Sequence, residues 1–225
     1  MLINLKNCKV YIISPATDKY ELRFYTVLQR VIKAGFNRVE FFRSVQSNHM
    51  YDSLTLTYIE IFKKELNSTE PFIILEDDCE LWTLYETLEV PDDFSFLYLG
   101  VSKWAYPYKL NTVYLDIGVR PNITIHSFYT VKSYDTNLVK VRAMNSTHAV
   151  LYSSREFLKE FVSLFENLQK SGIPIDIFYS AIIWTHQDKY NVYALKYPMF
   201  YQDGSIGGQE PITKVYYNGH TYLLG

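Results

Sequence analysis

The amino-acid sequence predicts an α/β protein with a mostly parallel central sheet flanked by helices and a small antiparallel addition. Two short apolar runs, at residues 9–14 and 71–75, end abruptly at polar or acidic residues, as strands buried on both faces do. Amphipathic stretches lie between such runs, and this alternation implies parallel strands joined by helical crossovers. The length of 225 residues suits one domain over residues 1–225 with a full core.

The first predicted strand, residues 9–14, is followed at once by a helix. Asp18 is a favourable N-cap residue with Glu21 three positions later, and Gly35 ends the helical pattern. Residues 38–43 then predict the second strand, so the chain opens with a βαβ unit. The apolar face that this helix is expected to bury consists of Leu22, Tyr25, Leu28 and Ile32.

Residues 52–66 predict a second helix, and an acidic strand at residues 71–80 comes next. Residues 94–100 predict a further buried strand. The stretch 104–131 alternates in polarity and contains prolines and a glycine, which indicates an irregular loop with antiparallel strands. The apolar face expected for the second helix consists of Leu54, Tyr58, Ile61 and Phe62.

The second half of the chain begins with a predicted strand at residues 147–152. Residues 153–156, Ser-Ser-Arg-Glu, form a capping box that opens a helix. Another helix begins near residues 173–176, and its N-terminus favours the ionised carboxylate of Asp176. Residues 197–208 predict a strand that leads into a glycine-rich loop. The apolar stripe of the helix after the capping box consists of Phe157, Phe161, Phe165 and Leu168.

The charge balance argues against nucleic acid and anionic membrane surfaces as partners. Lysine and arginine number 22 and aspartate and glutamate 24, a formal net charge of -2, so no nucleic-acid partner is predicted. No stretch approaches the ~20 apolar residues of a membrane span, and residues 1–8 do not resemble a secretory leader, so we expect a soluble, cytoplasmic protein. Cys8 and Cys79 are expected to be buried and reduced.

Three consecutive carboxylates, Glu76, Asp77 and Asp78, follow the apolar run of the third predicted strand. Ligands of open α/β sheets bind at the carboxyl ends of the strands, and hard divalent cations prefer oxygen ligands. The first strand ends at Ser14, so Ser14 and the carboxylates are expected at the same sheet edge. This pattern suggests a cation site; an acidic turn that merely caps a strand or opens a helix is the alternative, and it is the commoner origin of so short a motif taken alone.

Several motifs occur in order along the chain: the strand 10–14 with Asp18-Lys19 after it, Gly35-Phe36, Leu75-Glu76-Asp77-Asp78, Leu97-Tyr98-Leu99-Gly100, the strand 149–153, Pro174-Ile175-Asp176 and Tyr201-Gln202-Asp203. This ordered set resembles the family 25 glycosyltransferases. That family includes bacterial lipooligosaccharide galactosyltransferases, collagen galactosyltransferases and small transferase domains of large DNA viruses. The resemblance spans nearly the whole chain. It departs at Pro15-Ala16-Thr17, where the family has its first arginines.

The resemblance implies a single Rossmann-like domain of the GT-A type. Its nucleotide-binding half would span about residues 8–101 and its acceptor half about residues 102–225. The implied reaction is inverting transfer of a hexose from a nucleotide diphosphate sugar, with a uridine nucleotide expected, to a glycan or glycoprotein acceptor. The implied cofactor is Mn²⁺ or Mg²⁺. A viral relative would act in the cytoplasm of its host.

Within the resemblance, the last carboxylate of the acidic motif, Asp78, holds the metal directly. Glu76 binds metal-bound water or the donor, and Asp77 contacts ribose or sugar hydroxyls. Alternation of side chains along an extended strand predicts that Glu76 and Asp78 converge on one site.

Further candidates for the donor site lie at and after the end of the first strand. Ser14 and Asp18 are candidates for holding the base and ribose of the donor. Arg23 or Lys19 is a candidate phosphate partner, although a solvated helix face explains both residues about as well. His148 and His220 are candidate further metal ligands, although a lone histidine is more often structural.

Asp176 is the predicted general base that activates the acceptor hydroxyl. Its plain alternative is an N-cap residue, because aspartate is favoured there. Asp203 is the second candidate for the base.

Two other functions remain open at this stage. The domain is alternatively a catalytically silent module that binds a glycan or nucleotide on the same fold. A metal-dependent phosphohydrolase or nucleotidyltransferase would also use carboxylates at a strand end. Against a dehalogenase-type phosphatase, the first strand ends in Ile12-Ile13-Ser14-Pro15 and carries no Asp-x-Asp motif.

Overall fold

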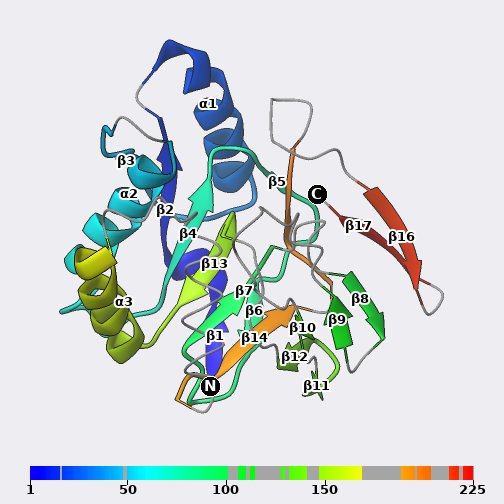
Figure 1. Cartoon of the computed structure of the whole chain (residues 1–225). Helices are drawn as coiled ribbons and strands as arrows, with labels where there is room; N and C mark the ends of the chain where they lie inside the picture. Colours follow the sequence, from blue (N-terminus) through cyan, green and yellow to red (C-terminus); the bar gives the residue numbers. More distant parts are fainter. Residues whose placement is uncertain are drawn as a thin grey trace.

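The computed structural model of the chain has an α/β architecture built around one central sheet (Figure 1). The structure describes residues 1–15, 17–47, 50–100, 106–109, 112–114, 128–129, 132–140, 147–168, 189–195, 197–203, 213–217 and 220–224. The helix predicted from residue 173, Asp176 and the glycine-rich loop at 204–208 lie outside these residues.

Eight strands form the central sheet within the described residues. In spatial order they are β11 (Lys132–Ser133), β12 (Leu138–Lys140), β14 (Val192–Leu195), β7 (Phe96–Tyr98), β13 (Ala149–Tyr152), β4 (Phe72–Glu76), β2 (Lys9–Ser14) and β3 (Arg38–Arg43). The predicted strands at 9–14 and 38–43 are confirmed with the same bounds. The apolar run of the acidic strand forms β4, which is buried in the middle of the sheet between β13 and β2.

Six of these eight strands run in the same direction. β2 is parallel to β3 and β4, and β4 and β7 are both antiparallel to β13, which makes them parallel to each other. β14 is parallel to β7, β12 is antiparallel to β14, and β11 reverses again. Only β12 and β13 therefore oppose the rest. The predicted mostly parallel sheet is confirmed, with β13 inserted as a reversed strand in its centre.

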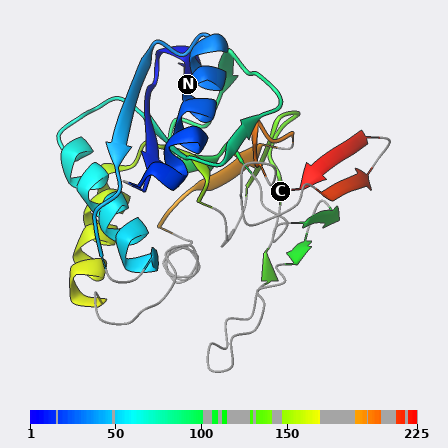
Figure 2. The same cartoon turned by 90° about the horizontal axis from the view of Figure 1, so that it is seen from above.

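Helices cover both faces of the sheet. Helix α2 (Met50–Glu65) and helix α3 (Arg155–Leu168) pack side by side on one face, and α1 (Asp18–Lys33) packs on the other. Figures 1 and 2 show α2 and α3 together on one side of β2 and β4, with α1 on the opposite side. The three-layer arrangement leaves the carboxyl ends of β2 and β4 at one edge.

The core under α2 and α3 is rich in aromatic side chains. Phe62 of α2 lies at its centre, with ring centroids 5.0 Å from Tyr152 and 5.1 Å from Phe161 at steep interplanar angles. Edge-to-face contacts of this kind are favourable for aromatic quadrupoles. The predicted apolar face of α2 is confirmed: Tyr58, Ile61 and Phe62 are fully buried and Leu54 packs against the same cluster.

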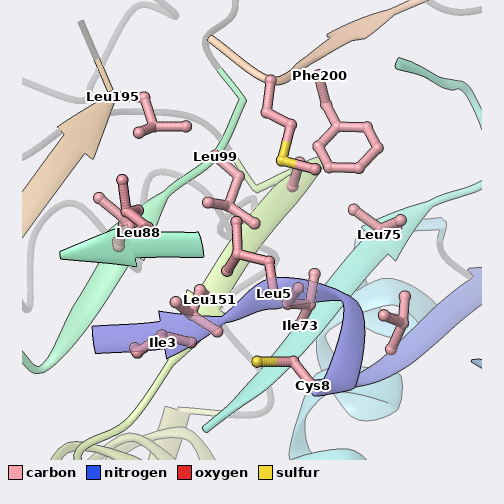
Figure 3. Close-up of a cluster of buried hydrophobic side chains, with 14 of the residues drawn as sticks. Ile3, Leu5, Cys8, Ile73, Leu75, Leu88, Leu99, Leu151, Leu195 and Phe200 are labelled. Atoms are coloured by element: carbon pink, nitrogen blue, oxygen red, sulfur yellow. The ribbon is translucent and has the colours of Figure 1, made fainter. Parts of the chain in front are cut away.

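The second core lies between the sheet and α1. Short elements near the N-terminus complete it: β1 (Leu2–Asn4), the 3-10 helix η1 (Leu5–Asn7), and β6 (Thr87–Glu89), which pairs with β1. Figure 3 shows Ile3, Leu5 and Leu88 from these elements in one cluster with Ile73, Leu75 and Leu151 of the sheet and with Leu99, directly after β7. Cys8 belongs to this cluster and Cys79 is also buried, and both cysteines are free as predicted.

The predicted buried face of α1 is wrong at three of its four residues, and Leu28 is the exception. Leu22, Tyr25 and Ile32 are exposed, whereas Val27 and Val31 are fully buried. Phe24 and Leu28 are partly buried against the same core. The helix carries two apolar stripes, and the one that faces the sheet also carries Arg23 and Arg30. Gly35, at φ 94°, ends the helix as predicted.

Helix α3 begins as the capping box predicts, with one shift. The hydroxyl of Ser154 accepts a hydrogen bond of 3.2 Å from the backbone N–H of Phe157, so Ser154 rather than Ser153 caps the helix. Phe157 and Phe161 are fully buried, as predicted. β14 was not predicted, although its residues are buried next to β7.

Smaller antiparallel sheets lie beside the central one. β5 (Cys79–Leu81) pairs with β15 (Phe200–Gln202), and β16 (Thr213–Tyr217) pairs with β17 (His220–Leu224). Within the stretch 104–131, β8 (Tyr106–Lys109), β9 (Thr112–Tyr114) and β10 (Phe128–Tyr129) form the predicted antiparallel strands. In the part of the chain that the structure describes, no helix is both long and apolar enough to cross a membrane.

Gly100, two residues after the end of β7, has no room for a side chain. A Cβ atom built there would clash with the ring of buried His148 and would lie 3.0 Å from the Cβ of Ala149. We therefore expect Gly100→Ala to lower the free energy of unfolding by about 1–3 kcal/mol, as measured by urea denaturation. In a His148→Ala background the same substitution should cost less. Equal costs in both backgrounds would show that the imidazole is not the obstacle.

Candidate functional site

The acidic motif forms a turn at the edge of the central sheet. β4 ends at Glu76, Asp77 and Asp78 make the turn, and β5 begins at Cys79. Ser14, the last residue of β2, donates a hydrogen bond of 2.6 Å from its Oγ to Oδ2 of Asp77. The predicted meeting of Ser14 with the carboxylates is therefore confirmed, because parallel strands β2 and β4 end at the same edge.

Arg23 of α1 binds both carboxylates of the turn. Its Nη2 lies 2.7 Å from Oδ1 of Asp77 and 3.2 Å from Oδ2 of Asp78. The guanidinium is itself largely buried and lies 5.1 Å from the ring centroid of Tyr20, within cation–π distance. One positive charge thus compensates two negative charges in a site shielded from water.

Burial makes these two carboxylates difficult to ionise. Asp77 is 4% exposed and Asp78 is 3% exposed. Desolvation raises the pKa of Asp78 to about 6; Arg23 opposes this shift and the charge of Asp77 adds to it. Desolvation also raises the pKa of Asp77, against the hydrogen bond from Ser14 and the charge of Arg23. Further positive charge at the turn would therefore stabilise both ionised carboxylates.

The two carboxylate oxygens of Asp78 differ in their contacts. Oδ2 of Asp78 contacts Arg23 and accepts a hydrogen bond of 3.4 Å from the amide of Gln202. Oδ1 is buried and has no hydrogen-bond partner among the described residues. Buried carboxylate oxygens are normally hydrogen-bonded or coordinate a metal, so Oδ1 is suited to a group that the folded chain does not itself supply.

Glu76 faces a different partner from the other two carboxylates. Its Oε1 accepts a hydrogen bond of 2.7 Å from the hydroxyl of Thr147, next to β13. The prediction that the extended strand continues to Asp78 is wrong, because the strand ends at Glu76 and the chain turns there. Strand alternation therefore does not describe the path from Glu76 to Asp78. Asp77 and Asp78 instead meet at Arg23.

A second arginine of α1, Arg30, also binds next to the turn. Nη2 of Arg30 lies 2.6 Å from Oδ2 of buried Asp203, and Nη1 donates to the carbonyl oxygen of Cys79 at 3.2 Å. The backbone N–H of Asp203 donates to the carbonyl oxygen of Asp78 at 2.6 Å. Asp203, the second candidate for the base, is thus part of a clamp that holds the main chain at Asp78.

The structure brings together only some of the predicted residues. Ser14, Asp77 and Asp78 lie together, whereas Asp176 and the side chain of Asp18 lie outside the described residues. His148 is fully buried, and desolvation lowers its pKa to about 4.

Sequence reasoning missed the carboxylate contacts of Arg23, the whole role of Arg30, and the part played by Gln202. The signal was present, because the two arginines are seven residues apart and two helical turns place them on one face.

The carboxylate oxygens at the turn suit one kind of cation site. Within the described residues, no group of three or more histidine, cysteine, aspartate or glutamate side chains is arranged to hold a metal ion. Two adjacent carboxylates with an unpartnered oxygen suit a hard divalent cation that takes its remaining ligands from water and phosphate, as Mg²⁺ commonly does. The residues therefore fit a cation bound jointly with a phosphorylated ligand.

No protein-family description matches the chain, and no curated protein sequence matches it. Among solved structures, one similar chain is a glycosyltransferase involved in the glycosylation of the major capsid of PBCV-1. It has 12% identity and a TM-score of 0.45, and the match covers 82% of this chain and 81% of that one.

Another similar chain is the nucleoside-diphosphate-sugar pyrophosphorylase from Vibrio cholerae RC9. It has 13% identity and a TM-score of 0.41, and the match covers 83% of this chain and 72% of that one. At these values the two similarities carry no argument about activity.

Substitution of Asp78 by asparagine is expected to stabilise the fold at neutral pH. The raised pKa means that ionised Asp78 disfavours the folded state above about pH 6, whereas protonated Asp78 does not below about pH 4. Asparagine carries no charge, so Asp78→Asn should raise the free energy of unfolding at pH 7 by about 1–3 kcal/mol, and this gain should vanish toward pH 4.

Urea denaturation at the two pH values measures this effect. Asp92→Asn, at an exposed carboxylate, serves as the control and should change stability by less than about 0.5 kcal/mol. A larger loss of stability for Asp78→Asn at pH 7 than at pH 4 would contradict the account of the turn.

Arg30→Ala should be costly, because it removes the guanidinium partner of a carboxylate that is 5% exposed. We expect a loss of about 2–4 kcal/mol in the free energy of unfolding. The matched control is Arg38→Ala, whose ion pair with Glu70 is largely exposed and should be worth about 0–1 kcal/mol. Equal losses for the two variants in chemical denaturation would mean that the Arg30 clamp does not hold the turn.

Proposed function

We propose that this chain is a glycosyltransferase that moves a hexose from a nucleotide diphosphate sugar to a glycan or glycoprotein acceptor, with the help of Mn²⁺ or Mg²⁺. The observation that carries the proposal is the buried pair Asp77 and Asp78 at the carboxyl edge of β4, with one oxygen of Asp78 unpartnered among the described residues. The ordered motifs that resemble family 25 glycosyltransferases give the pair this interpretation.

The location and the chemistry of the turn support this function. Open α/β sheets bind their ligands at the carboxyl ends of strands, where Ser14 and Asp77 meet. Departure of the sugar leaves concentrated negative charge on phosphate oxygens, and a divalent cation stabilises that charge as a Lewis acid. Arg23 lies at the same turn and adds a guanidinium whose planar donors match phosphate oxygens.

The proposed roles of the donor-site residues follow the family resemblance. Asp78 and Glu76 are assigned to the cation, Asp78 directly and Glu76 through water or the donor. Ser14, Asp18 and Asp77 are assigned to the nucleotide and sugar. In this proposal the nucleotide-binding half comprises about residues 8–101, and residues 102–225 bind the acceptor.

The transfer itself is a single displacement with inversion. The carboxylate of Asp176, the proposed general base, takes the proton of the acceptor hydroxyl while that oxygen attacks the anomeric carbon. The bond between this carbon and the diphosphate oxygen breaks, and the diphosphate leaves with the electron pair. The chain's own contribution is to hold the donor at the acidic turn and the acceptor against the base.

A catalytically silent binding module is the second candidate. The observation in its favour is the Arg23 guanidinium, which already compensates the carboxylates that a cation would need. Turnover separates the two functions. A transferase releases nucleoside diphosphate from a nucleotide sugar when manganese is present, and a binding module holds its ligand without releasing product.

The melting temperature tests the donor and the cation together, with nucleoside diphosphates and nucleotide sugars each assayed with and without manganese. A ligand at a hundred times its dissociation constant stabilises by roughly 2.7 kcal/mol, which corresponds to a shift of about 5–10 °C for a chain of this size. We expect stabilisation by a uridine nucleotide only when manganese is present.

Asp78→Ala should abolish this metal-dependent shift and metal-dependent turnover while leaving the circular dichroism spectrum of the folded protein unchanged. Glu89→Gln, on the exposed edge of β6, is the control and should keep both. Unchanged turnover in Asp78→Ala would remove the metal assignment. Absence of any ligand-induced shift in the natural chain would remove the proposed function.

A further inference from the structure

Arg23 sits where a bound cation would be expected. A single nitrogen of its guanidinium, Nη2, lies between Oδ1 of Asp77 and Oδ2 of Asp78, at 2.7 and 3.2 Å. The side chain is 15% exposed, so the contact is shielded from solvent and salt. The guanidinium is thus a monovalent cation that the chain itself supplies to its carboxylate pair.

The charges of these groups explain why a bound divalent cation would displace Arg23 from the carboxylates. The two ionised carboxylates carry two negative charges and Arg23 one positive charge, which leaves one negative charge on these three side chains, Glu76 not included. A divalent cation at the unpartnered oxygen of Asp78 would bring the total to one positive charge and would repel Arg23 at close range. An incoming diphosphate removes this excess and offers Arg23 a new anionic partner.

Arg23 and Arg30 of α1 contact different groups at the turn. Arg30 binds the main-chain carbonyl of Cys79 and the carboxylate of Asp203. Arg23 binds the two carboxylates for which a cation would compete. Arginine also has a flexible stem and a planar head that binds phosphate in a bidentate manner.

We propose that Arg23 is a resident counter-cation that transfers from Asp77 and Asp78 to the diphosphate of the donor when a divalent cation binds at the turn. The proposal rests on the proposed function for its diphosphate partner. Its consequence is a coupling between two ligands: the cation binds weakly alone and more tightly with the nucleotide, and the nucleotide gains the same factor from the cation.

The test measures binding rather than turnover. Manganese affinity is determined from the electron paramagnetic resonance signal of free Mn²⁺, and affinity for uridine diphosphate is determined by calorimetry with and without manganese. The variants are Arg23→Gln, which removes the charge, and Arg23→Lys, which keeps it. Arg38→Gln, at an exposed ion pair, is the matched control.

The expected effects of Arg23→Gln have opposite signs. Manganese alone should bind about tenfold more tightly, because no guanidinium competes for the carboxylates. Uridine diphosphate in the presence of manganese should bind about tenfold more weakly, because its arginine partner is gone; a factor of this size is usual for coupled sites. Arg23→Lys should lie between Arg23→Gln and the natural chain, and Arg38→Gln should match the natural chain.

Weaker binding of both ligands to Arg23→Gln would mean that Arg23 only braces the turn, and the proposal would be overturned. Unchanged or weaker binding of manganese alone would overturn it as well. If Arg23→Gln does not fold, the same comparison between Arg23→Lys and the natural chain decides.

Failure of the proposed function gives a different result. In that case the natural chain binds no uridine nucleotide, while the manganese measurement still reports whether Arg23 competes with a cation. Tighter manganese binding by Arg23→Gln would then support the resident counter-cation and overturn its transfer to a diphosphate.

Discussion

The ion pairs between α1 and the turn after β4 are the interaction on which the arrangement of this edge depends. Two buried carboxylates, Asp77 and Asp78, directly follow β4 in the middle of the sheet, and they require positive charge from nearby. Arg23 supplies that charge. Arg30 binds the carbonyl of Cys79 at the start of β5 and the carboxylate of Asp203, directly after β15. The same contacts fix which face of α1 turns toward the sheet.

Much of the fold could be predicted from local patterns. The interiors of β2 (residues 10–13) and β4 (residues 72–75) are apolar and end at polar or acidic residues, so burial on both faces could be predicted. The predicted apolar face of α2 is buried as well, although α2 also buries Thr55, Thr57 and Ile59. The meeting of Ser14 with Asp77 followed from topology alone, because the ends of neighbouring parallel strands share an edge.

The features that were missed depend on tertiary contacts. α1 has two apolar stripes. Leu22 and Tyr25 face solvent, whereas the face that carries Val27 and Val31 is buried, and the ion pair of Arg23 with the turn favours that face. The end of β4 at Glu76 could not be predicted from the sequence, because an acidic run is compatible with a strand or a turn. The reversed direction of β13 could not be predicted either, because the direction of a strand is set by the segments that connect it to its neighbours and not by its own residues.

The central claim is that the turn between β4 and β5 is where a diphosphate and a divalent cation bind together. A crystal structure grown with manganese and uridine diphosphate, with the metal located by its anomalous scattering, tests it most directly. The account predicts manganese within about 2.0–2.6 Å of a carboxylate oxygen of Asp78, with diphosphate oxygens in its coordination shell and Arg23 facing the diphosphate. Manganese bound elsewhere, or uridine diphosphate bound away from this turn, would contradict it.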